Sequence, residues 1–196
     1  VLTKEKIMLT ERQNQIISKA TNLIATQGFS NFTTKNLAAV IGFSEPALYR
    51  HFKNKQAILL AIMQKFEYLS EENIVFTKPL DGLPKLEAFI LNRLQFFSKN
   101  PKLTKVMLYD SDFRTDEVLS LKSKSIMQKH MQRLKLAISQ AKALNQISKN
   151  LDEEHVFYIV IGATRLLSTR WIMHNCNFDL NAQGKNLLET IKKIIV

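Results

Sequence analysis

The side chains best suited to bind a polyanion lie together between residues 33 and 55, in the stretch TTKNLAAVIGFSEPALYRHFKNK. Its hydroxyl, imidazole and ammonium groups can donate hydrogen bonds to phosphate oxygens, and its Lys and Glu side chains can reach groups on the edges of bases. The sequence shows no Gly-rich phosphate loop, nucleophile elbow or zinc motif. The chemistry of these residues is therefore that of binding, not of bond breaking.

Two short helices with a sharp corner between them are expected to position these side chains. Thr33 can cap the first helix, and Ser44 can cap a second helix that has Pro46 near its start. Gly42 can turn the chain between them at positive φ. The first helix presents an apolar face made of Leu37, Ala38 and Ile41. This order is the helix-turn-helix signature, in which the second helix enters the major groove of DNA.

The same stretch resembles the DNA-binding domain of the TetR/AcrR family of bacterial transcriptional repressors. The resemblance is closest in TTKNLA, at Gly42 and in PALYRHFKNK, and it covers roughly the first third of the chain. It implies a sequence-specific DNA-binding transcriptional regulator. Such a protein is expected to be a repressor that leaves its operator when a small-molecule effector binds.

Candidate contacts to the DNA backbone lie at the helix ends. Thr34 is at a helix N-terminus, where backbone amides favour anions. Tyr49 and His51 can donate to phosphate oxygens, and Lys55 begins the following helix. Ser44, at the start of the second helix, completes this group. Without the resemblance, each of these residues could equally be a solvated or half-buried surface side chain.

Candidate contacts to base edges lie at the start of the two short helices. Lys35 can donate to guanine, and Glu45 can accept from the amino group of cytosine. Pro46 and Ala47 offer apolar contact to a thymine methyl group. Arg50 can bind phosphate or stack, and its role stays open. The alternative for Glu45 is an acid that only stabilises a helix dipole.

The charge of the chain is consistent with a nucleic-acid partner. The 196 residues carry a net charge of +11, and the sequence pI is about 9.8. Residues 1–65 hold nine Lys and Arg against three acids, so this third of the chain carries +6 of that charge. The basic excess is thus concentrated around the helix-turn-helix.

The whole chain is expected to be all-α, with about nine helices. An N-terminal three-helix DNA-binding domain is expected in residues 1–54, and a C-terminal helical bundle for effector binding and dimerisation in residues 55–196. Residues 109–116 are expected to form a loop. Beyond the two short helices, apolar periodicity and caps place helices at about 11–27, 55–76, 85–98, 101–107, 117–145, 152–174 and 180–195. The helix at 152–174 is apolar on nearly all sides, which predicts burial on two faces.

The resemblance also implies how the bundle works. Its last two helices are expected to pair with those of a second copy, so that a homodimer binds a palindromic operator of double-stranded DNA. The bundle is expected to hold an effector of unknown identity. The candidate lining residues are Phe66, Phe89, Phe97, Met107, Met127, Met131 and Trp171. Such side chains at helical spacing are more often plain core.

Metal, cofactor and membrane roles are not indicated. His130 and His174 are expected to be satisfied or exposed histidines, and His174 with Cys176 forms too short a motif for a metal site. A single cysteine fits a reducing cytoplasm. No apolar run approaches the length of a membrane span, and the first residues lack the apolar core of a signal peptide.

Three other functions stay open beside that of a transcriptional regulator. The first is a nucleoid-occlusion protein of the same fold, which also binds a division protein. The second is a basic protein that coats DNA without sequence preference. The third is an enzyme, for which the only suggestion is a group of acids without an adjacent base, at Asp110, Asp112 and Asp116. We expect no enzymatic activity.

Overall fold

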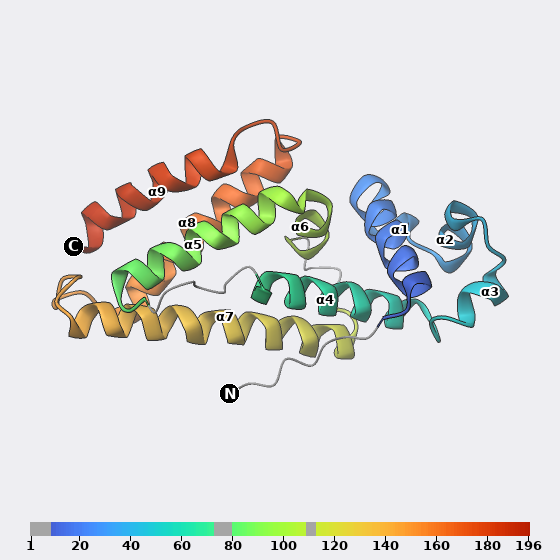
Figure 1. Cartoon of the computed structure of the whole chain (residues 1–196), viewed down its shortest axis with the longest axis horizontal. Coiled ribbons are helices and arrows are strands. Elements are labelled where there is room, and N and C mark those ends of the chain that lie inside the picture. The colour runs from blue at the N-terminus through green and yellow to red at the C-terminus, as the bar shows by residue number, and fades with distance from the viewer. Residues whose placement is uncertain (1–8, 73–79, 109–112) are drawn as a thin grey trace. The chain divides into compact units, whose positions relative to one another are not determined.

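The computed structural model describes residues 9–72, 80–108 and 113–196, and within these ranges every regular element is a helix (Figure 1). The prediction of an all-α fold with an N-terminal helix-turn-helix is confirmed. In chain order the helices are α1 (Glu11–Gln27), the 3-10 helix η1 (Phe29–Asn31), α2 (Thr34–Ile41), α3 (Glu45–Tyr49), α4 (Lys55–Glu72), α5 (Leu83–Lys99), α6 (Pro101–Leu108), α7 (Glu117–Ala143), α8 (Glu153–Met173) and α9 (Leu180–Ile195).

The chain divides into two compact units. The first contains Val1–Leu69 and Lys102–Ser125, and the second contains Ser70–Pro101 and Ile126–Val196. The division therefore falls inside α4 and α7, and also between the first two residues of α6. These units are defined by packing alone. They do not test the expected domain boundary between residues 54 and 55, which stays a prediction.

In the first unit, α1 begins and ends where its capping residues predict. The Thr10 hydroxyl accepts from the amide of Gln13, whose side chain in turn accepts from the amide of Thr10. Gly28 ends the helix at φ 82°, a conformation that favours glycine. The buried face includes Ile16, Ile17, Ala20, Leu23 and Ile24, and Phe32 is also fully buried. The core of this unit is thus the one that the apolar spacing predicts.

In the second unit, α5 and α8 pack together and α9 packs against both (Figure 1). α9 approaches α5 closely at Gly184, because a Cβ there would lie 2.2 Å from a methyl carbon of the buried Leu94. The Trp171 indole N–H donates to the carbonyl of Phe178 at 3.0 Å and closes the turn between α8 and α9. The first contact therefore joins α9 to α5, and the second ties the end of α8 to the segment before α9.

Helix α8 is buried on one face only. Val156, Phe157 and Val160 are buried, whereas Tyr158 and Leu166 are 56% and 63% exposed. The expectation that this helix is covered on two faces is therefore wrong for the described part of a single chain, where apolar side chains of the second face are exposed. Among the described residues, α8 alone has the length and apolar composition of a membrane span, a test that core helices of soluble proteins also pass.

Helix ends differ from the predicted ones at a few positions. α5 begins at Leu83 instead of residue 85, because Pro84 fits the first turn of a helix. α7 ends at Ala143 instead of residue 145, since Asn145 adopts a φ of 55°. Residues 73–76 of the expected fourth helix lie outside the described residues, as do residues 109–112 of the expected loop. Phe113, within that loop, is buried and its ring packs edge-on against Phe29.

Candidate nucleic-acid interface

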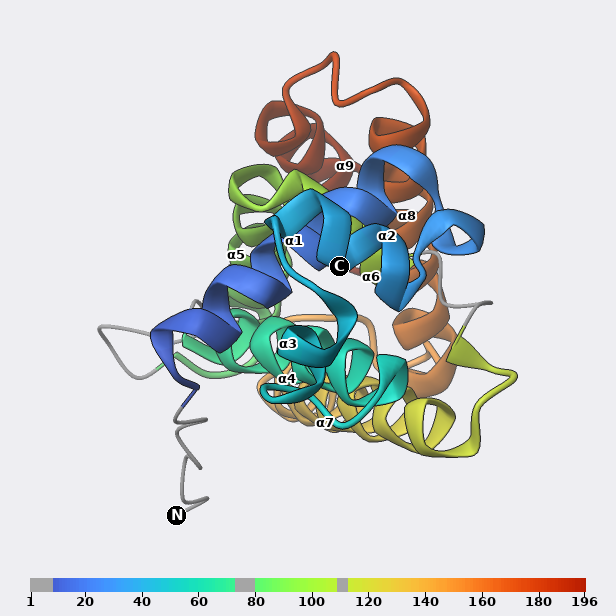
Figure 2. The same cartoon turned by 90° about the vertical axis from the view of Figure 1, so that its right-hand side faces the viewer.

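The corner between α2 and α3 has the predicted geometry. Thr33 accepts from the amide of Asn36 at 3.0 Å and caps α2. Gly42 adopts the left-handed conformation at φ 80° and ψ 34°. Ser44 caps α3 by accepting from the amide of Ala47 at 3.4 Å. Figure 2 shows α2 and α3 on the side of the first unit that faces the viewer. The buried Leu48 anchors α3, and the polar side chains at the start of this helix stay at the surface.

A chain of hydrogen bonds joins the two short helices. The Thr34 hydroxyl donates to a carboxylate oxygen of Glu45 at 2.7 Å. The Tyr49 hydroxyl donates to the oxygen of Thr34 at 3.4 Å. Three candidate contact residues therefore position one another before any DNA is bound. These bonds join the first residue of α2 to both ends of α3, and they help to set the angle between the two helices.

An aromatic stack supports the other side of the corner. The rings of Phe43 and His51 are nearly parallel, with centroids 6.2 Å apart. The guanidinium carbon of Arg12 lies 4.2 Å from the centroid of Phe43. The side-chain amide of Gln13 donates to the carbonyl of His51 at 3.1 Å. Residues at the start of α1 thus contact the turn and the end of the helix-turn-helix and stabilise them.

Lys55 lies at the first position of α4, where the prediction placed it. The carboxamide oxygen of Asn54 accepts from the amide of Ala57 at 2.8 Å and caps the helix. The Lys55 ammonium lies 5.2 Å from the centroid of the Phe32 ring, a cation–π contact that holds the exposed side chain against the first unit. The ammonium and the positive end of the helix dipole therefore lie near each other.

The candidate DNA contacts all lie in the first unit, and none is buried. The half-buried ones are Thr34, Glu45, Ala47 and His51, and the exposed ones are Lys35, Ser44, Pro46, Tyr49, Arg50 and Lys55. One surface residue was missed. Arg12 is exposed beside Phe43, but no local pattern signals it, because it is 31 positions away from that ring in the sequence.

The candidate effector residues are split between the two units. Phe66 and Met107 belong to the first unit, and the others belong to the second. Four of them are buried and the three methionines are half-buried; the buried ones are Phe66, Phe89, Phe97 and Trp171. A cavity of about 300 Å³ lies elsewhere in the first unit, between α1, η1 and α6, and none of the candidates lines it. Their role in ligand binding stays a prediction.

His130 is not the satisfied or exposed histidine that we expected. It is 4% exposed, its ring packs edge-on against Phe89, and its Nδ1 atom has no hydrogen-bond partner among the described residues. Burial, together with the charges of Arg93, Arg133 and Lys129, lowers its pKa to about 3. The imidazole is therefore neutral. His174, in contrast, is exposed as expected.

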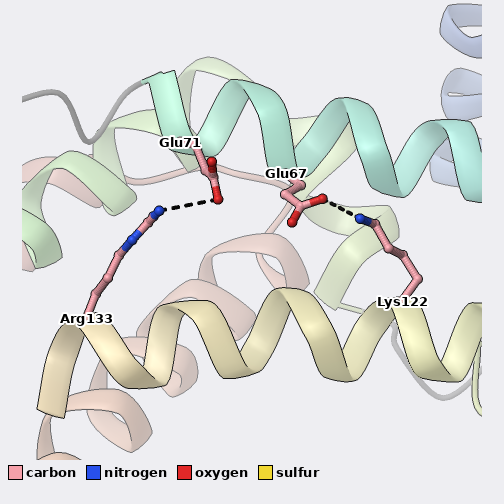
Figure 3. Close-up of polar contacts among 4 residues, drawn as sticks. All are labelled: Glu67, Glu71, Lys122 and Arg133. Carbon is pink, nitrogen blue, oxygen red and sulfur yellow. Dashed lines mark hydrogen bonds and ion pairs between the residues drawn. The ribbon is translucent and has the colours of Figure 1, made fainter. Parts of the chain in front are cut away.

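Two ion pairs join α4 to α7 (Figure 3). Within the first unit Glu67 pairs with Lys122, and within the second unit Glu71 pairs with Arg133 at 3.3 Å. Only one nitrogen of Arg133 takes part, since its Nη1 atom is buried without a partner in the part of the chain that the structure describes. The second pair thus leaves a donor unused.

The acids considered for catalysis do not form a reactive group. Asp110 and Asp112 lie outside the described residues. Asp116 accepts from the amide of Leu119 and from the side chain of Gln56, and these hydrogen bonds lower its pKa. It therefore caps the start of α7. Within residues 9–72, 80–108 and 113–196, no group of three His, Cys, Asp or Glu side chains could hold a metal ion.

Two family models together match nearly the whole chain. Residues 16–62, which include the corner described above, match the model of bacterial regulatory proteins of the tetR family. Residues 62–194 match the model of the C-terminal region of YsiA-like protein. The two matched regions meet at residue 62, within α4.

The curated proteins similar to this chain include nucleoid occlusion factors. The nucleoid occlusion factor SlmA of Serratia proteamaculans is 32% identical over 106 residues, which are 53% of this chain and 54% of that protein. The chain thus spans about half the length of the SlmA relatives that it matches in this way.

Solved structures show the same fold over nearly the whole length. The fatty acid degradation regulator FadR of Bacillus halodurans has a TM-score of 0.78 at 21% identity, covering 93% of this chain and 95% of that one. FadR of Bacillus subtilis, solved in complex with stearoyl-CoA, has a TM-score of 0.73 at 23% identity, covering 91% and 96%.

Proposed function

Because the chain belongs to the TetR family of bacterial regulatory proteins, we propose that it is a transcriptional repressor released from its operator by a small-molecule effector. The observation that carries this proposal is the corner between α2 and α3, whose polar side chains are positioned at the surface and held by one another. Lys35, Glu45 and their neighbours would read base edges, and Thr34, Tyr49, His51 and Lys55 would bind phosphates.

A long-chain acyl-CoA is our candidate effector. The second family match covers residues 62–194, which include the helical bundle that would hold the effector. FadR of Bacillus subtilis, which has the same fold, was solved with stearoyl-CoA. Phe89 and Phe97 are buried in the second unit and could contact an acyl chain. Stearoyl-CoA is therefore the first ligand to test.

A homodimer through α8 and α9 would cover the exposed apolar face of α8. Tyr158, Leu166 and Met173 are 56%, 63% and 69% exposed, and Ile194 on α9 is 56% exposed. A face of this kind is rarely left in water by a monomer. Two copies would present two α3 helices to a palindromic operator, with half-sites roughly 34–36 Å apart. Its partner being chromosomal DNA, the protein would act in the cytoplasm.

The proposal is tested by titrating the protein against a duplex taken from just upstream of its own gene. A scrambled duplex serves as the control, and both are measured at two salt concentrations and with stearoyl-CoA added. Selective binding by two chains per site, reversed by stearoyl-CoA, would support the proposal. Equal and strongly salt-dependent binding to both duplexes would instead support a DNA-coating protein.

Nucleoid occlusion is the second candidate, because the SlmA relatives are 32% identical over the part of the chain that they match. The two functions differ in where the binding sites lie. A genome-wide map of bound DNA would show sites spread across the chromosome for an occlusion factor, and sites at a few promoters for a repressor. The likeness of the fold to the transcriptional regulator FadR of Bacillus subtilis, over 91% of this chain, supports the repressor.

A further inference from the structure

Three basic side chains lie close together in the second unit, and among the described residues one acid, Glu71, pairs with them. They are Arg93 on α5 and His130 and Arg133 on α7, and we call these three residues the basic cluster. His130 and Arg133 are three positions apart, so they share one face of α7. Arg93 is one turn beyond Phe89, whose ring packs against His130 with the centroids 6.0 Å apart. Two helices of one unit therefore contribute to the cluster.

The cluster contains two buried polar atoms that bind nothing. His130 Nδ1 and Arg133 Nη1 are the buried side-chain nitrogens without a hydrogen-bond partner in the described parts of the chain. Leaving a buried donor unpaired costs free energy, more so when the group is charged. Native proteins rarely retain such atoms unless a ligand or an ordered water satisfies them.

Among the described residues, one carboxylate is paired with the positive charges of the cluster. Burial and the nearby charge of Arg165 together lower the pKa of Arg93 to about 10. The Arg93 guanidinium lies 5.1 Å from the centroid of Phe97, whose ring face offsets part of the charge. Glu71 is the acid paired with the cluster, and it reaches Arg133 alone. An added anion would therefore be stabilised at this place.

We propose that the basic cluster binds an oxyanion of the effector, with Arg133 Nη1 and His130 Nδ1 as hydrogen-bond donors and Arg93 as an additional positive charge. Neutral imidazole can place its proton on Nδ1, so His130 can donate without becoming charged. The oxyanion is either a fatty-acid carboxylate or a phosphate of coenzyme A, and both chemistries suit a guanidinium. The proposal rests on the proposed function, which supplies an effector for the bundle.

The bound oxyanion would compete with Glu71 for Arg133. Glu71 lies in the last turns of α4, and the same helix begins at Lys55, a candidate phosphate contact. An anion that draws Arg133 away would remove the partner of Glu71 in this pair. The cluster would in this way link the presence of an anion to the position of α4. Removing the Glu71 carboxylate should then make anion binding tighter, whereas removing a cluster residue should make it weaker.

Binding is measured by isothermal titration calorimetry on the full chain, with stearoyl-CoA, stearate, coenzyme A and the neutral octadecanol as probes. Arg133→Gln and His130→Phe should each weaken the binding of an oxyanion probe by about tenfold or more. Glu71→Gln should tighten it severalfold. Glu67→Gln is the matched control, because Glu67 lies one turn away on α4 and pairs with Lys122 instead. It should leave the affinity unchanged.

The probes identify the source of the oxyanion. Stearate binding that depends on the cluster assigns it to a carboxylate, and coenzyme A binding that depends on the cluster assigns it to a phosphate. Unchanged affinity in both cluster variants would overturn the proposal, and so would octadecanol binding as tightly as the charged probes. The absence of any binding by the charged probes would overturn it too.

Histidine signals of the unaltered protein provide a second measurement that does not depend on variants folding. In a long-range ¹H–¹⁵N spectrum the Nδ1 resonance of His130 should shift on adding the oxyanion probe, while exposed His155 should not. If His130 does not respond, the cluster does not bind the anion. Release of DNA by stearoyl-CoA in wild type and cluster variants alike would leave the repressor proposal intact and refute the cluster. Binding at the cluster without release of DNA would support the cluster and refute the effector-released repressor.

Discussion

The hydroxyl of Thr34 donates a 2.7 Å hydrogen bond to the carboxylate of Glu45, so the first residue of α2 is tied to the first residue of α3. Glu45 is therefore occupied by a partner within the protein before DNA arrives. A carboxylate has further lone pairs and can still accept from a cytosine amino group. The bond makes Glu45 a residue that both positions the reading helix and can contact a base.

Thr34→Val removes this hydroxyl with almost no change in shape. It should weaken binding to operator and scrambled duplexes by similar amounts, about 1 kcal/mol, because the orientation of α3 is less well fixed. Fluorescence anisotropy on the two duplexes measures the effect. Thr26→Val is the control, since the Thr26 hydroxyl bonds only within its own helix, to the carbonyls of Asn22 and Leu23. A loss confined to the operator would contradict the positioning role.

Lys35→Ala should relax the preference for particular base pairs. Lys35 is exposed at the second position of α2, and a side chain there can reach guanine acceptors. Operator binding should lose about 1–3 kcal/mol, while binding to a scrambled duplex should lose much less. A library of single-base operator variants measures the change. An unaltered preference at every position would exclude Lys35 from base reading.

Lys55→Ala should weaken binding to all duplexes and reduce the slope of log affinity against log salt by about one unit. The reason is that one ammonium at the start of α4 would no longer replace a counterion on a phosphate. Titrations at several salt concentrations give the slope. Lys193→Ala removes the same charge from an exposed position on α9 and should change neither quantity.

Leu166→Glu should convert the proposed dimer into a monomer. The side chain is 63% exposed on α8, so a carboxylate is tolerated in the single chain but would be buried in an interface. Light scattering after gel filtration measures the mass, and operator affinity should fall together with dimerisation. Leu144→Glu, at a 53% exposed position after α7, is the matched control. A dimeric Leu166→Glu protein would place the interface elsewhere.

His130 should make the folded state sensitive to acid. Its pKa is held near 3 by burial and by Arg93, Arg133 and Lys129, against an ordinary value of 6.5. Below pH 6.5 the imidazole of His130 is protonated in the unfolded chain but stays neutral in the folded chain. The contribution of neutral His130 to the free energy of unfolding is therefore fully present above pH 6.5 and is lost as the pH falls toward 3. The slope is at most about 1.4 kcal/mol per pH unit.

Urea unfolding at pH 7 and pH 5 tests this behaviour. Wild type should lose about 2 kcal/mol more than His130→Gln between the two values, since Gln has no proton to gain. Equal losses in the two proteins would show that His130 does not titrate at a depressed pKa in the folded chain.

The sequence predicts the helix-turn-helix in detail because its signals are local. Thr33, Gly42 and Ser44 act within a few residues of their own positions, and the structure has all three in the predicted roles. The bond from Thr34 to Glu45 joins residues that lie in different helices, and Arg12 meets Phe43 across 31 positions. Contacts of this kind depend on how helices pack, which periodicity does not specify.

In the second unit, too, the sequence predicts burial of apolar residues but not the contacts between helices. The apolar spacing places Phe89 and Phe97 correctly in the interior, and both are buried. The spacing also marks His130 as a polar residue in a mostly polar helix, where exposure is the ordinary outcome. Its burial follows from the way that α5 packs on this face of α7, at Phe89. The unpaired nitrogens appear only when side chains of separate helices are placed together.

The two carboxylates of α4 that pair with α7 are four residues apart and project from one side of the helix. Rotation of α4 about its own axis would therefore separate Glu67 and Glu71 from their cations together. Bending of the helix near Ser70 would instead break the pair of Glu71 with Arg133 and leave that of Glu67 with Lys122. Which pairs survive when an effector binds would thus distinguish a rigid turn of the helix from a bend within it.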